Sequence, residues 1–178
     1  GVLKNTLVIV TSDHGEQFGE HGLYLHGQSL YREEVHVPLI LVPPGSSAAD
    51  RKVDRPVSLR DLPATIADFA GLGSKHPFPG SSLRRLWDDS DDNDDEEPIR
   101  SEVAIVKKPA RNGNRPPSLR GPMASVVHDG YVYLRDALGT EELFDLVKDR
   151  SETRNLAASP EYRPVLERLR KLHAEGEK

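Results

Sequence analysis

Two short apolar runs, separated by a polar and glycine-rich stretch, constrain the fold of this chain more than any other feature. The runs are residues 6–11 (TLVIVT) and residues 37–42 (VPLILV). Continuous β-branched and apolar residues predict strands that are covered on both faces, as in a parallel sheet. The sequence Ser-Asp-His-Gly, residues 12–15, directly follows the first run. Because ligands of open α/β sheets bind beyond the carboxyl ends of the strands, we expect an α/β fold with a site at residues 12–15.

The sequence beyond the second run predicts an amphipathic helix over residues 61–72. Asp61 can cap this helix, Pro63 lies in its first turn, and Gly71 ends it. We expect the helix to pack on the sheet. Its expected core-facing side chains are Leu62, Ile66, Phe69 and Ala70.

A small antiparallel sheet and a final helix are expected in the second half of the chain. The dipeptide Asp129-Gly130 predicts a two-residue hairpin turn, because both turn positions need a positive φ. The final helix is expected to have Ser159 as its cap and Pro160 in its first turn. The strands are predicted at residues 102–106, 125–128, 131–135 and 142–146, and the apolar helix face at Val165, Leu166, Leu169 and Leu172.

Two polar segments are expected to form loops. Residues 88–98 are an acidic low-complexity stretch that cannot bury enough apolar surface to become ordered. A solvated loop is favoured over a calcium loop there, because the glycine and the terminal glutamate of an EF-hand are missing. Residues 107–122 are rich in proline, arginine, glycine and asparagine. Their arginines could meet an anionic substrate, but an irregular surface loop is the simpler interpretation.

The composition describes a polar chain without cysteine and without a membrane span. The absence of cysteine excludes disulfides, thiolate zinc sites and a cysteine nucleophile within these residues. No apolar run approaches the roughly 18 residues that a spanning helix needs. The formal charge of -5 becomes +3 when the eight acidic residues at positions 88–97 are left out. A mildly basic remainder suits an anionic substrate, and no nucleic-acid partner is expected.

Asp13 and His14 are the candidate metal-binding pair. A carboxylate oxygen and an imidazole nitrogen together suit a divalent cation. Gly15 permits the backbone turn that would let both side chains reach one ion. From residue types alone, Asp13 could instead cap a following helix, and His14 could be an ordinary hydrogen-bonded loop residue.

The longer pattern resembles a known family. Residues 5–45 (NTLVIVTSDHGEQFGEHGLYLHGQSLYREEVHVPLILVPPG) closely resemble sulfatases and their relatives in the alkaline-phosphatase superfamily. Residues 139–157 (GTEELFDLVKDRSETRNLA) are similar to the closing segment of that family's C-terminal subdomain. The resemblance implies that residues 1–98 are the C-terminal part of the catalytic α/β domain, with a mixed sheet and flanking helices. Residues 99–178 would be a small C-terminal α+β subdomain.

The resemblance also implies roles for individual residues. Asp13 and His14 would be ligands of a divalent cation, usually calcium, with manganese, magnesium or zinc as alternatives. His26 stands where the family commonly has a lysine that contacts the sulfate or the leaving-group oxygen. A protonated imidazole could stabilise the anion or donate a proton to the departing alkoxide, so His26 is predicted to be catalytic and substrate-binding. His21 is interpreted as a structural residue of the Gly-Glu-His-Gly turn, and His36 as a shielding residue rather than a ligand.

The remaining polar candidates carry no predicted role in catalysis. His76, His128 and His173 have no supporting neighbours and are expected at the surface. Ser29 and Tyr31 are expected near the mouth of the site, but they match no nucleophile arrangement.

The family's nucleophile, a Cys or Ser matured to formylglycine, belongs to a Cys/Ser-x-Pro-x-Arg signature that precedes the region covered here. An earlier acidic pair completes the family's metal site. This chain has no cysteine, and none of its serines is followed by proline and arginine at those offsets. We therefore expect a piece of a longer enzyme that is inactive by itself and binds its cation weakly.

The predicted function of the parent protein is metal-dependent hydrolysis of a sulfuric ester, such as a sulfated glycan. The histidine at position 26 keeps open a phosphoester or phosphonate hydrolase, or a phosphoethanolamine transferase, of the same superfamily. A non-catalytic anion-binding module is the alternative from a different class. An extracytoplasmic or periplasmic location is slightly favoured for the parent protein.

Overall fold

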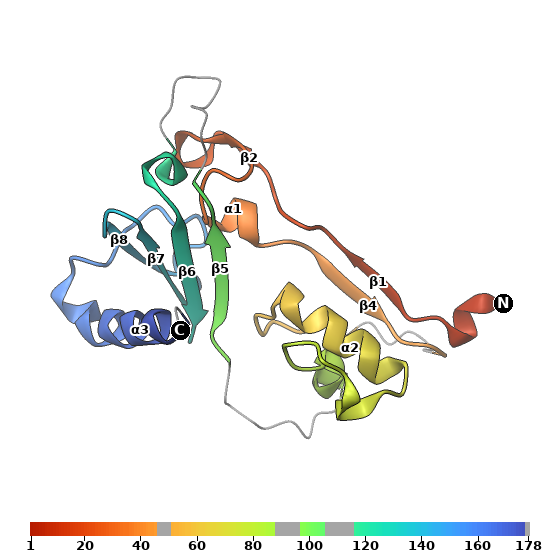
Figure 1. Ribbon diagram of the computed structural model, residues 1–178. Helices are drawn as coiled ribbons and strands as arrows, with labels where there is room; N and C mark the ends of the chain where they lie inside the picture. Colours follow the sequence, from red (N-terminus) through yellow and green to blue (C-terminus); the bar gives the residue numbers. More distant parts are fainter. Residues whose placement is uncertain (46–50, 88–96, 106–115, 177–178) are drawn as a thin grey trace. The chain divides into compact units, whose positions relative to one another are not determined.

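The computed structural model describes residues 1–45, 51–87, 97–105 and 116–176, which form two compact units (Figure 1). The first unit comprises Gly1–Thr11 and Pro38–Asp95, and the second comprises Ser12–Val37 and Glu96–Lys178. Most of the two expected loops, at residues 88–98 and 107–122, lies outside the described residues. In the described part of the chain, no helix is long and apolar enough to cross a membrane.

The two apolar runs form the strands β1 (Val8–Thr11) and β4 (Leu39–Val42), and these strands pair with each other. The pairing is antiparallel, with Val8 opposite Val42. This finding differs from the expected parallel neighbour, and the described residues do not cover both faces of β1, since Val10 is 51% exposed. An apolar run specifies a strand, but it does not specify the direction or the identity of the strand's partner.

The predicted helix of the first unit is α2 (Leu62–Phe69), which follows Asp61 as expected. Its buried face differs from the predicted one, because Thr65 is fully buried and Ile66 is 50% exposed. The Thr65 hydroxyl accepts a hydrogen bond from the backbone N–H of Leu83 at 2.9 Å. The face of α2 that packs against the segment containing Leu83 is therefore narrow and partly polar. Short 3-10 helices of this unit are η1 (Val2–Asn5), η3 (Leu59–Asp61), η4 (Gly73–Lys75) and η5 (Leu83–Trp87).

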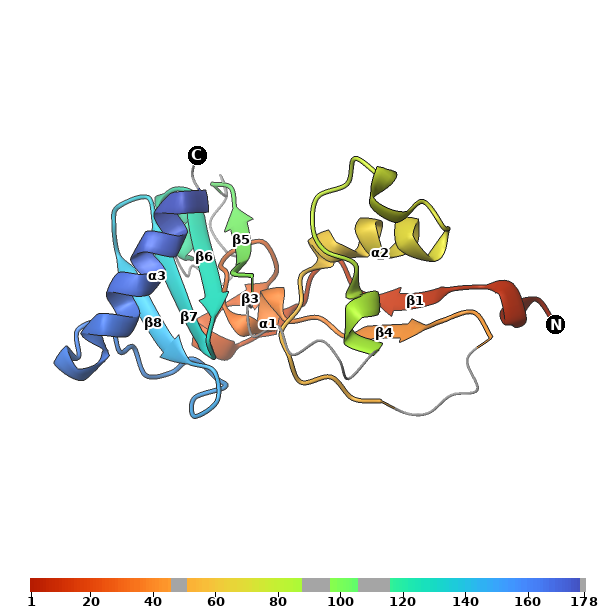
Figure 2. The ribbon, with the colours of Figure 1, turned by 90° about the horizontal axis from the view of Figure 1, so that it is seen from below.

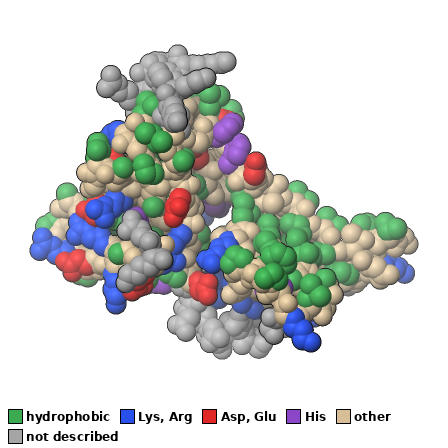
Figure 3. Space-filling view, viewed as in Figure 1, with side chains coloured by type: hydrophobic (Ala, Val, Ile, Leu, Met, Phe, Trp, Pro, Cys, Tyr) green, Lys and Arg blue, Asp and Glu red, His purple; other side chains and the backbone are tan. Residues whose placement is uncertain are grey.

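Hydrophobic side chains remain accessible on the first unit, and Figure 3 shows many of them gathered over the region of α2. They include Val10, Ile40, Ile66, Leu72 and Phe78. Exposed apolar surface of this kind marks a face that another part of a protein covers.

The second unit is built on a four-stranded antiparallel sheet of order β5-β6-β7-β8. Asp129 and Gly130 join β6 to β7 with φ of 49° and 74°, which confirms the predicted two-residue hairpin. The strands are β5 (Ile99–Val103), β6 (Met123–His128), β7 (Tyr131–Asp136) and β8 (Glu141–Asp145). The expected small antiparallel sheet is thus confirmed, with boundaries shifted by at most three residues.

The final helix α3 (Arg163–Gly176) covers one face of this sheet (Figure 2). It follows the 3-10 turn η7 (Pro160–Tyr162), and its predicted apolar face is confirmed by the burial of Leu166 and Leu169. His173, expected at the surface, is only 6% exposed because its ring packs edge-on against a tyrosine of β7. That expectation was wrong, since a histidine on the apolar side of a helix is buried with its neighbours.

The opposite face of the sheet packs against residues 12–37. Leu23, Leu30 and Tyr31 are buried there together with Met123, Val132, Leu134 and Phe144. The elements of this segment are β2 (Gln17–Phe18), η2 (Glu20–Gly22), β3 (Tyr24–Leu25) and α1 (Arg32–Val35), and η6 (Pro117–Arg120) belongs to the same unit. The candidate site residues therefore share a compact unit with residues 99–178, whereas the predicted division at residue 98 grouped them with β1 and β4.

Candidate functional site

The turn after β1 is held by hydrogen bonds around Gly15. The Ser12 hydroxyl donates to the carbonyl oxygen of His14 at 2.7 Å, and the Gly15 N–H donates to the carbonyl oxygen of Glu34 at 2.8 Å. A side chain at position 15 would place its Cβ 1.9 Å from the carbonyl oxygen of Glu33. Glycine is required here because α1 approaches the turn too closely for any Cβ, and the neighbouring aspartate and histidine are thereby directed to solvent.

Asp13 and His14 present their side chains in a geometry that fits one shared cation. The Asp13 carboxylate is 87% exposed, and its Oδ2 lies 3.7 Å from Nε2 of His14. The Nδ1 atom of His14 lies 2.8 Å from the Gly15 carbonyl, which can only accept, so Nδ1 carries a hydrogen and Nε2 offers a lone pair when the ring is neutral. A backbone carbonyl that fixes the outer ring nitrogen is the usual arrangement for a metal-binding histidine.

The electrostatics of this pair agree with its geometry. A hydrogen bond with its own backbone N–H, followed by the neighbouring His14, holds the pKa of Asp13 below its ordinary value. The hydrogen bond to the Gly15 carbonyl is the main cause that raises the pKa of His14. The Asp13 carboxylate is therefore ionised at neutral pH and can serve as an oxygen ligand of a cation.

His26 lies directly against His14. The two rings stack with centroids 4.0 Å apart and an interplanar angle of 28°. The Nδ1 atom of His26 lies 3.1 Å from Oε2 of Glu16, a residue that the sequence analysis did not single out. The backbone turns on both sides of this histidine, because Leu25 and Gly27 have φ of 72° and 73°. The structure thus brings the three predicted site residues into one exposed cluster, and their roles stay predictions.

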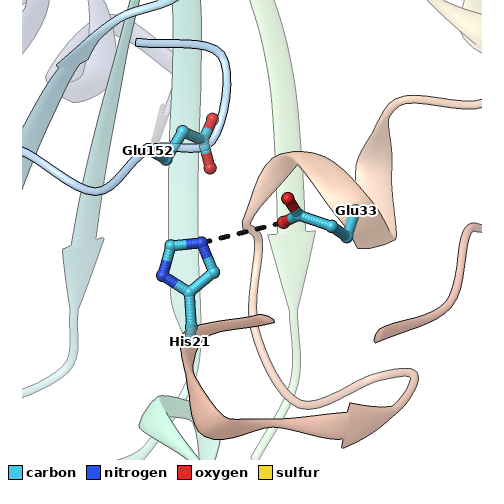
Figure 4. A group of neighbouring side chains, drawn as sticks. All are labelled: His21, Glu33 and Glu152. Atoms are coloured by element: carbon cyan, nitrogen blue, oxygen red, sulfur yellow. Dashed lines mark ion pairs between the residues drawn. The ribbon is translucent and has the colours of Figure 1, made fainter. Parts of the chain in front are cut away.

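A second group of ionisable side chains lies in the same unit (Figure 4). His21, Glu33 and Glu152 each offer a donor atom within 4.8 Å of the others, and Nε2 of His21 lies 3.7 Å from Oε2 of Glu33. The His21 ring also stacks on Tyr31 at 3.8 Å. Glu152 is only 3% exposed and accepts a hydrogen bond from the Arg32 N–H at 2.8 Å. This group borders a cavity of about 420 Å³. Of its three members, the sequence singled out only His21, as a structural residue of its turn.

Burial raises the pKa of Glu152 to about 7, with the nearby Glu33 adding to the shift. A raised carboxyl pKa stabilises the fold while the group is protonated and loses that contribution as pH rises through the folded value. Between pH 4.5 and pH 7 the free energy of unfolding should therefore fall by up to about 3 kcal/mol because of Glu152. Glu152→Gln should remove this slope, which urea unfolding of the full-length protein at several pH values measures.

Asp149→Asn is the matched control for this experiment. Hydrogen bonds from backbone N–H groups, that of Arg154 above all, lower the pKa of Asp149, so its own contribution changes only in more acidic solution. Asp149 contributes less than burial and Glu33 to the raised pKa of Glu152, so the control variant should keep most of the slope between pH 4.5 and pH 7. If the difference between wild type and Glu152→Gln stays constant over that range, the buried carboxyl does not titrate as described.

His36, the residue that follows α1, contacts the arginine at the start of that helix. The Arg32 guanidinium contacts Nε2 of His36 at 3.2 Å, and burial together with Arg32 lowers the pKa of His36. Its interpretation as a shielding residue stays a prediction. Ser29, expected near the mouth of the site, is 2% exposed and donates its hydroxyl to Glu34 at 2.8 Å.

Comparison with known proteins shows which proteins this chain is similar to. The family model described as Sulfatase matches residues 1–72. A Delta 4,5-hexuronate-2-O-sulfatase of Bacteroides thetaiotaomicron is 30% identical over 175 residues, which cover 95% of this chain and 34% of that protein. The chain thus spans about a third of the length of this curated relative.

Two solved structures show the same arrangement of elements. A 2-O GAG sulfatase superimposes with a TM-score of 0.80 at 27% identity, covering 97% of this chain and 36% of that one. The phosphonate monoester hydrolase of Agrobacterium radiobacter superimposes with a TM-score of 0.75, also at 27% identity, covering 98% of this chain and 36% of that one. The expected alkaline-phosphatase-like α/β fold is confirmed by these similarities.

Proposed function

Since this chain belongs to the sulfatase family of the alkaline-phosphatase superfamily, we propose that the full-length protein hydrolyses sulfate esters with the help of a divalent cation. The observation that carries this proposal is the cluster formed by the Asp13–His14 pair and the stacked His26 ring. A metal-ligand pair and an anion-binding side chain meet there within one exposed patch. Proteins of this family depend on a divalent cation, and calcium is proposed here, with manganese, magnesium and zinc as alternatives.

The proposed roles follow from the donor atoms. Oδ2 of Asp13 and Nε2 of His14 would hold the cation, which supplies Lewis-acid stabilisation of the ester oxygens when bound. The exposed His26 ring would contact the sulfate group or the leaving-group oxygen and, when protonated, could pass a proton to that oxygen. Glu16 orients this ring through its contact with Nδ1 at 3.1 Å, so Nε2 is the ring nitrogen proposed to meet the substrate. The nucleophile is proposed to come from sequence outside these 178 residues.

The substrate class is proposed to be a sulfated glycan. The relative from Bacteroides thetaiotaomicron carries the name of a hexuronate sulfatase, and one structural neighbour that of a 2-O GAG sulfatase. A phosphonate or phosphate ester is the second candidate, because a phosphonate monoester hydrolase shares the fold at a TM-score of 0.75. A free-standing anion-binding module is the remaining alternative, and it requires no hydrolysis at all.

A direct assay separates these candidates. The full-length protein would be incubated with an unsaturated hexuronate 2-sulfate disaccharide, 4-nitrophenyl sulfate, and a 4-nitrophenyl phosphonate monoester, each with calcium and with EDTA. We expect calcium-dependent release of inorganic sulfate that exceeds phosphonate hydrolysis. Faster cleavage of the phosphonate would favour the second candidate, and no cleavage of any ester would contradict both hydrolytic functions.

A further inference from the structure

Glu34 is a buried carboxylate that contacts both segments of the candidate site. It lies in α1 and is only 4% exposed. One carboxylate oxygen accepts a hydrogen bond from the Gln28 N–H at 3.0 Å, and the other accepts from the Ser29 hydroxyl at 2.8 Å. The carbonyl oxygen of the same residue accepts from the Gly15 N–H at 2.8 Å. One residue thus joins the turn that carries His14 to the loop that follows His26.

The Glu34 carboxylate is one of two anchors of the loop between His26 and Ser29, the other being the Ser118 N–H, which donates to the carbonyl oxygen of Gln28 at 3.2 Å. Gly27 has φ of 73°, and a Cβ added at this position would meet no heavy atom within 4 Å, so packing does not hold it in place. Gln28 and Ser29, by contrast, are 7% and 2% exposed. The Glu34 carboxylate therefore fixes Gln28 and Ser29, the first buried residues after Gly27. Because His26 directly precedes Gly27, this attachment limits where His26 can lie.

Two contacts define the position of the half-exposed His26 ring. Its ring centroid lies 4.0 Å from that of His14, and its Nδ1 lies 3.1 Å from Oε2 of Glu16. Misplacing a group at a reacting centre by about 1 Å costs on the order of 100-fold in rate. We infer that Glu34 is a positioning residue that holds His26 against His14, an inference that rests on the proposed function for its effect on turnover.

The expected effect is a loss of about 10- to 100-fold in kcat/KM when Glu34 is replaced by alanine in the full-length protein. In a His26→Ala background the same replacement should change kcat/KM by less than about 3-fold, because the residue through which it acts is gone. Glu34→Gln keeps the size and one acceptor, so it should show a smaller loss with the same non-additivity. This second variant decides the question if the alanine variant does not fold.

Asp136→Ala is the matched control. Asp136 is a carboxylate of the same unit, 5% exposed; its Oδ1 accepts two hydrogen bonds, from the N–H groups of Leu138 and Thr140, and its Oδ2 pairs with the Arg120 guanidinium at 3.0 Å. Its replacement should weaken folding, yet its effect on kcat/KM should add to that of His26→Ala. Additive effects of Glu34 and His26 would overturn the inference.

A crystal structure of the full-length Glu34→Gln variant tests the same inference without any activity. The stacking of His14 and His26 should be lost or lengthened beyond 4.0 Å while the sheet β5-β6-β7-β8 stays unchanged. Rings that remain stacked as in the parent would contradict the positioning role. If the wild-type protein hydrolyses no ester, the proposed function fails, and this comparison still decides whether Glu34 holds the loop.

Discussion

Replacing Asp13 by alanine is expected to lower kcat/KM for sulfate-ester hydrolysis by more than about 100-fold in the full-length protein. Residues that merely support a metal ligand cost 10- to 100-fold when removed, so the loss of a direct ligand should exceed that range. The calcium concentration needed for half-maximal activity should rise at the same time. Enzyme assays over a calcium titration measure both quantities.

The fold should not suffer from this replacement. The Asp13 side chain is 87% exposed, and its hydrogen bond to the His14 N–H at 3.1 Å is local. Stability should therefore stay within about 0.5 kcal/mol of the wild type. Asp54→Ala is the matched control, because Asp54 is 79% exposed and pairs only with Lys52 at 2.6 Å among the described ion pairs. If the Asp13→Ala enzyme shows an unchanged calcium dependence, Asp13 is not a ligand of the metal.

Replacing His26 by alanine is expected to lower kcat for a sugar sulfate by about 100- to 10,000-fold, the range of general acid catalysis. The loss should be smaller for 4-nitrophenyl sulfate, because nitrophenolate leaves without needing a proton. Steady-state assays on both esters with the same enzyme preparation measure this difference.

Two variants sharpen the interpretation of His26. His26→Lys should recover part of the activity on both esters if the side chain mainly supplies positive charge. Glu16→Gln removes the charge next to Nδ1 but keeps a polar contact, so it should cause a smaller loss than His26→Ala. Equal losses for the two esters would contradict proton donation by His26 and leave only its contact with the anion. If neither ester shows a loss, His26 is not part of the site.

The parts of the fold that sequence predicted well are those set by local interactions. The Asp129-Gly130 hairpin follows from two adjacent residues that tolerate positive φ, and both have it. The face of α3 follows from helical periodicity and is buried as expected. The direction of the β1–β4 pairing could not be predicted in the same way, because an apolar run shows no preference for one partner strand over another.

The candidate site shows the same limit. Asp13, His14 and His26 were predicted from the motif, and the structure places them in one cluster. Glu34 was missed, because a glutamate in a charged Arg-Glu-Glu segment ordinarily lies at the surface. Its burial depends on donors from a loop that packs against the sheet of the second unit. Glu152 was missed for a similar reason, since its partner Arg32 lies 120 residues away in the sequence.

The measurement that tests the central claim most directly is an anomalous-difference map from crystals of the full-length protein grown with calcium. We predict a peak about 2.3 to 2.6 Å from Oδ2 of Asp13 and close to Nε2 of His14, beside the His26 ring. A peak among His21, Glu33 and Glu152 instead, with none at Asp13, would contradict the assignment of this cluster as the cation end of a sulfate-ester site.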